Sequence, residues 1–156
     1  MSNNVRGSKR VSAYLEEKGI QARVVTLDES TRTSQLAADA LGCTVAEIAK
    51  SIVFKAGEQA VVVVISGDKR VDAKKVSVQL EVKVGNADAD TVKTLTGYAI
   101  GGVPPFPHDP NVKVLLDRSL TRFERVWAAA GTPNSVMNLT VEQLGGIIGN
   151  FVDVAA

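Results

Sequence analysis

The chain has 156 residues, of which 45% are hydrophobic and 22% are charged. This is the composition of an ordinary globular domain, and the length suffices to bury one core. Gross disorder is therefore excluded, and we expect a single domain over residues 1–156. The formal net charge is +1, without a long block of one sign, which argues against a broad surface for wrapping DNA. A small binding surface for a nucleic acid is still compatible with this net charge.

The cysteine and histidine content and the lengths of the apolar runs bear on metal binding and on cellular location. Cys43 is the only cysteine and His108 the only histidine, so an internal disulfide is impossible and a clustered zinc site is disfavoured. We expect neither a metal nor a cofactor. The polar start lacks the apolar run of a secretory signal, and the longest apolar run, at Ala60–Ile65, is too short to cross a bilayer. We therefore expect a cytoplasmic protein without a membrane anchor.

The hydrophobic pattern predicts helices and strands in a mixed order. Glycine ends helices naturally, and β-branched runs favour strands. The expected elements are a helix ending at Gly19, a strand over 20–27, a helix over 34–41, a short helix over 45–50, strands over 51–55 and 59–66, helices over 73–80 and 89–95, a loop over 97–109, a strand over 112–117, a helical piece over 120–123, strands over 125–130 and 136–139, and a helix over 141–148. This order predicts an α+β domain with a mixed, partly closed β-sheet surrounded by helices.

Polar residues stand where the expected helices begin. Their side-chain oxygens can accept the free backbone N–H groups of the first turn. The expected caps are Thr33 or Ser34, Asp72, Asp88 or Asp90, and Thr140. Thr44 and Glu47 have the spacing of a capping box and predict the short helix over 45–50, which would leave Lys50 at its C-terminal end.

Lys50 is the first candidate for chemistry. A lysine at the end of a helix is commonplace, because the helix dipole favours positive charge there. The neighbouring residues, however, are apolar on both sides, at 48–49 and 52–53. If Lys50 points inward, its ammonium needs a partner or a ligand oxygen, since an unpaired buried charge is costly.

The second candidate is the loop GYAIGGVPPFPHD at 97–109. Gly101 and Gly102 have no side chains, so a ligand can approach their N–H groups closely, and the three prolines, Pro105 among them, stiffen the backbone. Such a loop suits a carbonyl or an oxyanion, although the same residues also build an ordinary stiff turn. The loop has neither the dinucleotide-binding nor the P-loop spacing of glycines.

His108 and the turn GTPNS at 131–135 complete the candidates. His108 is the one imidazole that could act as a base, but no GxSxG stretch supplies a nucleophile, so we expect it to order the loop or border a pocket. Gly131 and Thr132 belong to a turn between two strands, and such a turn can also present Thr132 to a pocket.

Four stretches carry a resemblance to a known family. They are AKSIVFK at Ala49–Lys55, SGDKRVD at Ser66–Asp72, GYAIGGVPPFPH at 97–108 and AAAGTPNS at Ala128–Ser135. With the preceding TSQLAADALGCTVAEIAKS, they resemble the YbaK/EbsC family, the prolyl-tRNA-synthetase-associated editing domain. The similarity runs from about Thr33 to Leu144 and follows the family's order.

The resemblance implies a mixed α+β fold and a trans-editing deacylase. Such an enzyme hydrolyses the ester that joins a wrong, small amino acid to the 3′ end of a tRNA, usually tRNA(Pro). Lys50 falls on the family's lysine, and Gly101 and Pro105 fit its GxxxP loop, which holds the aminoacyl end. Pro107 stands where glycine is common, and GTPNS replaces a histidine-proline segment of the alanine-editing relatives. The identity of the amino acid is therefore left open.

The resemblance also implies partners. The aminoacyl-tRNA 3′ end would be the substrate, and a synthetase or an elongation factor would hand over the tRNA. A binding module that holds RNA ends or a small ligand without hydrolysis, and a purely structural domain, are the alternatives. The oligomeric state is open.

Overall fold

The computed structural model describes residues 3–27 and 33–156. The helices are α1 (Asn3–Lys18), α2 (Ser34–Leu41), α3 (Ala73–Leu80), α4 (Ala89–Thr96) and α5 (Val141–Ile148), with 3₁₀ turns η1 (Val45–Glu47) and η2 (Arg118–Arg122). The strands are β1 (Arg23–Thr26), β2 (Ile48–Ala56), β3 (Gln59–Ser66), β4 (Gly85–Asn86), β5 (Lys113–Asp117), β6 (Arg125–Ala129), β7 (Ser135–Thr140) and β8 (Phe151–Val152).

The helix starts predicted from cap residues are confirmed. The side chains of Thr33, Asp72, Asp88 and Thr140 each accept a backbone N–H of the helix that follows. Gly42 ends α2 in the left-handed conformation, at φ 69°, which glycine adopts without steric cost. The two shortest strands, β4 and β8, were not predicted, because two residues leave no periodic pattern.

The predicted short helix over 45–50 is wrong in its extent. The Glu47 carboxylate does accept from the backbone N–H of Thr44, at 3.0 Å, but only the turn η1 forms. From Ile48 on, the backbone pairs with β3 on one side, and Ile48 and Ala49 pair with β6 on the other. Strand pairing thus replaces helical hydrogen bonds, and Lys50 is the third residue of a strand rather than a helix C-terminus.

The α+β class and the mixed sheet are confirmed, whereas the partial closure is not. The strand order is β1-β7-β6-β2-β3-β5-β8, with β4 paired to β2 beside this path. β2–β6, β3–β5 and β5–β8 are parallel, and the other pairs are antiparallel. The path ends at β1 and β8, which are not paired with each other, so among the described residues the sheet is open.

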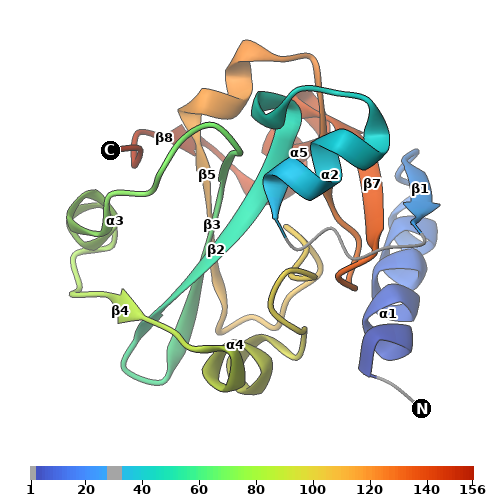
Figure 1. Ribbon diagram of the computed structural model, residues 1–156. Coiled ribbons are helices and arrows are strands. Elements are labelled where there is room, and N and C mark those ends of the chain that lie inside the picture. Colours follow the sequence, from blue (N-terminus) through green and yellow to red (C-terminus); the bar gives the residue numbers. More distant parts are fainter. Residues whose placement is uncertain (1–2, 28–32) are drawn as a thin grey trace.

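The core lies on both faces of β3. Val62 and Val64 belong to the larger cluster, with residues of α1, α4 and α5, while Val61 and Val63 belong to a smaller one, with residues of α3. All four valines are fully buried, which explains why this strand reads as an unbroken apolar run. Figure 1 shows α1 and α3 at opposite sides of the molecule, with β2 and β3 between them.

Candidate functional site

A cavity of about 640 Å³ opens where β2 separates from β6. Its walls come from the start of α2, from β2, β4, α4, the loop at 97–109, β6 and β7. β2 pairs with β6 only at Ile48 and Ala49, and with β4 only at Phe54 and Lys55. The stretch at 50–53 therefore has no neighbouring strand on that edge among the described residues, and the cavity occupies the gap.

The gap exposes main-chain hydrogen-bonding groups of β2. The Ile48 carbonyl accepts from Gly67 N–H on the β3 side, at 2.7 Å. In an antiparallel pair, successive residues direct their N–H and C=O groups alternately toward the partner and away from it. The even-numbered residues of β2 thus bond β3, and the N–H and C=O groups of Ser51 and Val53 face the gap. These groups can bind the polar atoms of a ligand.

Lys50 borders this cavity. Its Nζ donates to the Gly67 carbonyl at 3.4 Å, which is long for such a bond. Partial burial lowers the pKa of Lys50, while the negative charge of Asp68 opposes that shift and Arg70 adds to it. Within the described part of the chain, the Gly67 carbonyl is the one hydrogen-bond acceptor of this ammonium, so donors are left for a ligand oxygen.

Much of the remaining wall is apolar. Val92, Val103, Ala128 and Val136 contribute small aliphatic side chains. Polar residues also line the cavity, and one of them, Ser51, has a buried Oγ without a hydrogen-bond partner among the described residues. A buried hydroxyl without a partner is uncommon in a folded protein, and a ligand bound in this cavity would supply one.

The glycine- and proline-rich loop reaches the cavity through Gly101 and Val103. Gly102 does not serve as a free donor, because its N–H is bonded to the Ala99 carbonyl at 2.9 Å. A Cβ at Gly102 would lie 2.6 Å from the carbonyl carbon of Thr132, so this glycine permits close packing on the turn at 131–135. Pro105, in the same loop, is buried and does not line the cavity.

His108 lies outside the cavity wall. Its Nε2 is 2.7 Å from the Pro104 carbonyl, and since a carbonyl only accepts, Nε2 carries the proton. Its ring also meets the Tyr98 ring edge-on, with centroids 5.4 Å apart. Burial lowers the pKa of His108, so the imidazole is neutral near pH 7. Both contacts tie His108 to residues of its own loop.

Gly131 and Thr132 lie behind the cavity rather than in its wall. The Thr132 hydroxyl is hydrogen-bonded to Asn134 Oδ1 at 2.9 Å and to Ser135 Oγ at 2.6 Å. Gly131 has a φ of 100°, and a Cβ there would collide with the Gly7 carbonyl of α1. Of the candidates predicted from the sequence, the structure thus brings Lys50 and Gly101 into one cavity, and the others do not line it.

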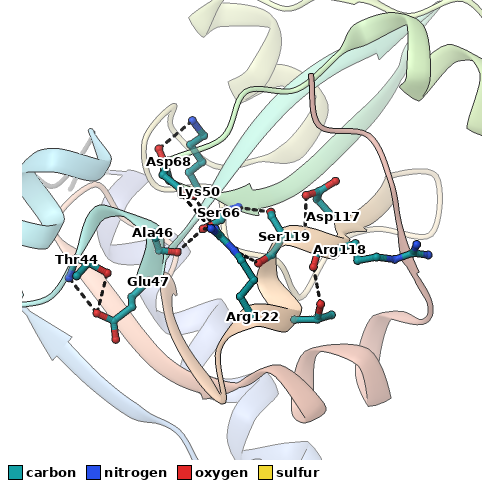
Figure 2. Close-up of polar contacts among 12 residues, drawn as sticks. Thr44, Ala46, Glu47, Lys50, Ser66, Asp68, Asp117, Arg118, Ser119 and Arg122 are labelled. Carbon is teal, nitrogen blue, oxygen red and sulfur yellow. Dashed lines mark hydrogen bonds and ion pairs between the residues drawn. The ribbon is translucent and has the colours of Figure 1, made fainter.

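Sequence reasoning missed two contributors to the site. Trp127, on β6, lines the cavity, and no motif marked it. Asp68 and Arg122 form an ion pair beside Lys50 with an N–O distance of 2.7 Å, shown in Figure 2, although 54 residues separate them. Asp68 belongs to the stretch SGDKRVD, but nothing in the sequence links it to an arginine so far along the chain.

Among the described residues, no three side chains of histidine, cysteine, aspartate or glutamate come together as a possible metal-binding group. None of the helices in this part of the chain has both the length and the hydropathy needed to cross a bilayer.

The chain is similar in sequence and structure to known aminoacyl-tRNA editing proteins. The family model described as aminoacyl-tRNA editing domain matches residues 28–146. The uncharacterized protein YwhH of Bacillus subtilis is 35% identical over 87% of both chains. The multifunctional Ser/Thr-tRNA deacylase ProXp-y of Escherichia coli is 27% identical over 84% of this chain and 83% of its own. The crystal structure of a protein described as a trans-editing enzyme for prolyl tRNA synthetase superposes on this chain with a TM-score of 0.87. The two are 35% identical, and the match covers 100% of this chain and 99% of the other.

Proposed function

The chain belongs to the aminoacyl-tRNA editing domain family and is an aminoacyl-tRNA deacylase, and we propose that the cavity beside Lys50 is where it hydrolyses tRNA charged with a small amino acid. The observation that carries this proposal is a partly buried ammonium with one long hydrogen bond, at the border of a mostly apolar cavity. An ester carbonyl supplies the oxygen that such an ammonium needs, and the acyl side chain suits the apolar wall.

The proposed reaction is the attack of water on the ester carbonyl carbon. The water oxygen forms the new bond, the bond from that carbon to the ribose oxygen breaks, and the ribose oxygen takes up a proton. The negative charge that develops on the carbonyl oxygen is stabilised by Lys50 and by the backbone donors that face the gap. An aminoacyl ester is already activated, so positioning and electrostatics can supply the remaining rate enhancement, and a hydroxyl of the terminal ribose can help to orient the water.

The amino acid is selected by the size of the cavity. Side chains such as Val92 and Ala128 leave room for a small acyl group and exclude a large one, as the second sieve of an editing enzyme does. The substrate that we propose is tRNA(Pro) carrying a small non-cognate amino acid, because the similar crystal structure is linked to prolyl tRNA synthetase. The synthetase or an elongation factor would deliver the tRNA in the cytoplasm.

The first experiment is a deacylation time course on tRNA(Pro) charged with alanine, cysteine, serine or threonine. We expect selective turnover by the parent protein and a loss of about 100-fold or more in Lys50→Ala, the size seen when one stabilising group of an oxyanion is removed. Lys55→Ala is the matched control, because Lys55 lies on the same strand, is exposed and does not line the cavity.

A parent-like rate in Lys50→Ala would remove Lys50 from the mechanism. Stable binding of charged tRNA without turnover of any substrate would support the alternative, a module that binds RNA ends or a small ligand without hydrolysis.

A further inference from the structure

Arg122 and Asp68 form the centre of a polar network that lies next to Lys50 (Figure 2). Arg122 Nη2 donates to Asp68 Oδ1 at 2.7 Å, and Nη1 donates to Oδ2 at 3.1 Å. The guanidinium holds the pKa of Asp68 at about 2, so the carboxylate is ionised throughout the physiological range. The ion pair is bidentate, with two parallel hydrogen bonds, so it fixes the relative orientation of the two side chains as well as the distance between them.

The same guanidinium also binds the end of β3. Nη2 donates to Ser66 Oγ at 2.8 Å, and Nε donates to the Ser119 carbonyl at 2.8 Å. Ser66 is fully buried, and its hydroxyl donates to the Ala46 carbonyl just before β2. Ser66 N–H in turn donates to Ser119 Oγ at 3.2 Å. Arg122 therefore ties η2 to the residues on both sides of Gly67.

Gly67 is the residue that this network encloses. Its N–H bonds the Ile48 carbonyl, and its own carbonyl accepts from Lys50 Nζ at 3.4 Å. A Cβ at position 67 would collide with the Val45 carbonyl and would come within 2.9 Å of Ser34 Cβ. Residue 67 is thus closely packed against Val45 and Ser34, and Arg122 binds the residues before and after it.

We propose that Arg122 is a positioning residue for Lys50: by holding Ser66 and Asp68 together, it fixes the Gly67 carbonyl that directs the Lys50 ammonium toward the cavity. The catalytic consequence rests on the proposed function, because it assumes that Lys50 acts on the ester. Arg122 itself does not line the cavity.

The exposure of this pair argues against a role in stability alone. The side chains of Arg122 and Asp68 are 40% and 35% exposed, so solvent screens the attraction between their charges. Four directed bonds from one guanidinium instead restrict local geometry. A lysine keeps the positive charge of Arg122 but cannot form the bidentate hydrogen bonds of a guanidinium. Replacing arginine by lysine therefore separates the effect of the charge from the effect of the directed hydrogen bonds.

The test compares Arg122→Gln and Arg122→Lys with the parent protein. Arg125→Gln is the matched control, because Arg125 is an exposed arginine whose side chain bonds Asn138 at 3.1 Å and does not line the cavity. Two readouts are needed. The first is kcat and KM for deacylation. The second is the ¹³Cε signal of Lys50 in lysine-labelled protein, assigned by its loss in Lys50→Ala, and followed against pH without substrate.

We expect Arg122→Gln to lower kcat by about 10- to 100-fold, the range that misplacing a reacting group by up to 1 Å can cause. We also expect the Lys50 signal to move toward that of the exposed lysines, with Arg122→Lys in between and Arg125→Gln unchanged.

Two results would overturn the proposal: a Lys50 signal unaffected by Arg122→Gln, whether or not activity is lost, or full recovery of both readouts by Arg122→Lys. Failure of the proposed function is distinguishable from these results. If Lys50→Ala stayed active, the catalytic role of Lys50 would be lost, while the signal of Lys50 would still report whether Arg122 positions it.

Discussion

At the scale of single residues, burial affects the charge of the two titratable candidates, Lys50 and His108, differently. Burial lowers the pKa of both Lys50 and His108. His108, with an ordinary pKa near 6.5, becomes neutral near pH 7, whereas the negative charge of Asp68 opposes the lowering at Lys50 and favours its charged form. Lys50 is therefore the residue able to stabilise a negative charge, and His108 is a hydrogen-bond donor to its own loop.

The buried His108 makes stability depend on pH. Its folded pKa lies below the ordinary value, so the unfolded chain takes up a proton first as the pH falls. The stabilising contribution is complete above the ordinary pKa and is lost as the pH falls through the folded one. We expect the free energy of unfolding to decrease between pH 7.5 and pH 5, by about 1.4 kcal/mol for each unit that separates the two pKa values.

His108→Gln should flatten this dependence, since its amide can still donate to Pro104 but does not titrate. Urea denaturation at pH 7.5 and pH 5 measures the effect. An equally steep dependence in the variant would assign it to another group, and deacylation at pH 7.5 should stay close to that of the parent.

At the scale of elements, close packing between backbones sets the shape of the site. The loop at 97–109 lies against the turn at 131–135 through Gly102, and that turn lies against α1 through Gly131 and Gly7. The turn is also tied to the end of β1, because Leu27 N–H donates to the Asn134 carbonyl at 2.7 Å. The glycines thus let three segments meet behind the cavity.

Gly102→Ala should push the loop away from this turn. Its Cβ would meet backbone atoms of Thr132 and Pro133 at 2.6–2.9 Å, and backbone cannot move aside as a flexible side chain can. We expect a loss of about 1–3 kcal/mol in the free energy of unfolding, together with reduced deacylation, because Gly101 would move with the loop.

Gly146→Ala is the control for that substitution. Gly146 lies in α5, and a Cβ there would meet nothing within 4 Å, so alanine should add up to about 1 kcal/mol through its helix propensity. The free energies come from urea denaturation of both variants. A Gly102→Ala protein as stable as the parent would show that the loop and the turn can separate freely.

At the scale of the whole molecule, β3 is the rigid centre and the sheet's end at β1 is the periphery. β3 pairs with β2 on one side and with β5 on the other, and its valines are buried on both faces. β1, at one end of the strand path, pairs with β7, and its Val24 is 40% exposed. Local stability follows burial and pairing, so these two regions should differ in how readily they open.

Amide hydrogen exchange tests this difference. We expect the amides of Val62 to Val64 to exchange most slowly in the chain and to report global unfolding, whereas the amides of β1 should exchange through local opening. The central strand exchanging as fast as β1 would contradict the assignment of the core.

The sequence by itself determined the features that depend on neighbouring residues. Caps such as Asp72 and Asp88, the glycine that ends α2 and the apolar run of β3 act within a few residues, so their patterns are legible along the chain. The family could also be predicted, and Lys50 could be proposed as a site residue, since the motif around Lys50 is contiguous. The side chains that act there were proposed on that basis, and their roles stay predictions.

Only the tertiary structure decided what depends on contacts between distant segments. Ile48 and Ala49 pair with β6, and Lys50 pairs with Ile65 of β3, so the chain continues as a strand after η1 and not as a helix. Pairing with segments as distant as Trp127, 79 positions from Ile48, outweighs the local capping box. The open sheet, the gap that leaves Ser51 facing the cavity and the Arg122–Asp68 pair arise in the same way. No local pattern encodes them, because the free energy that stabilises them is gained only when remote parts of the chain meet.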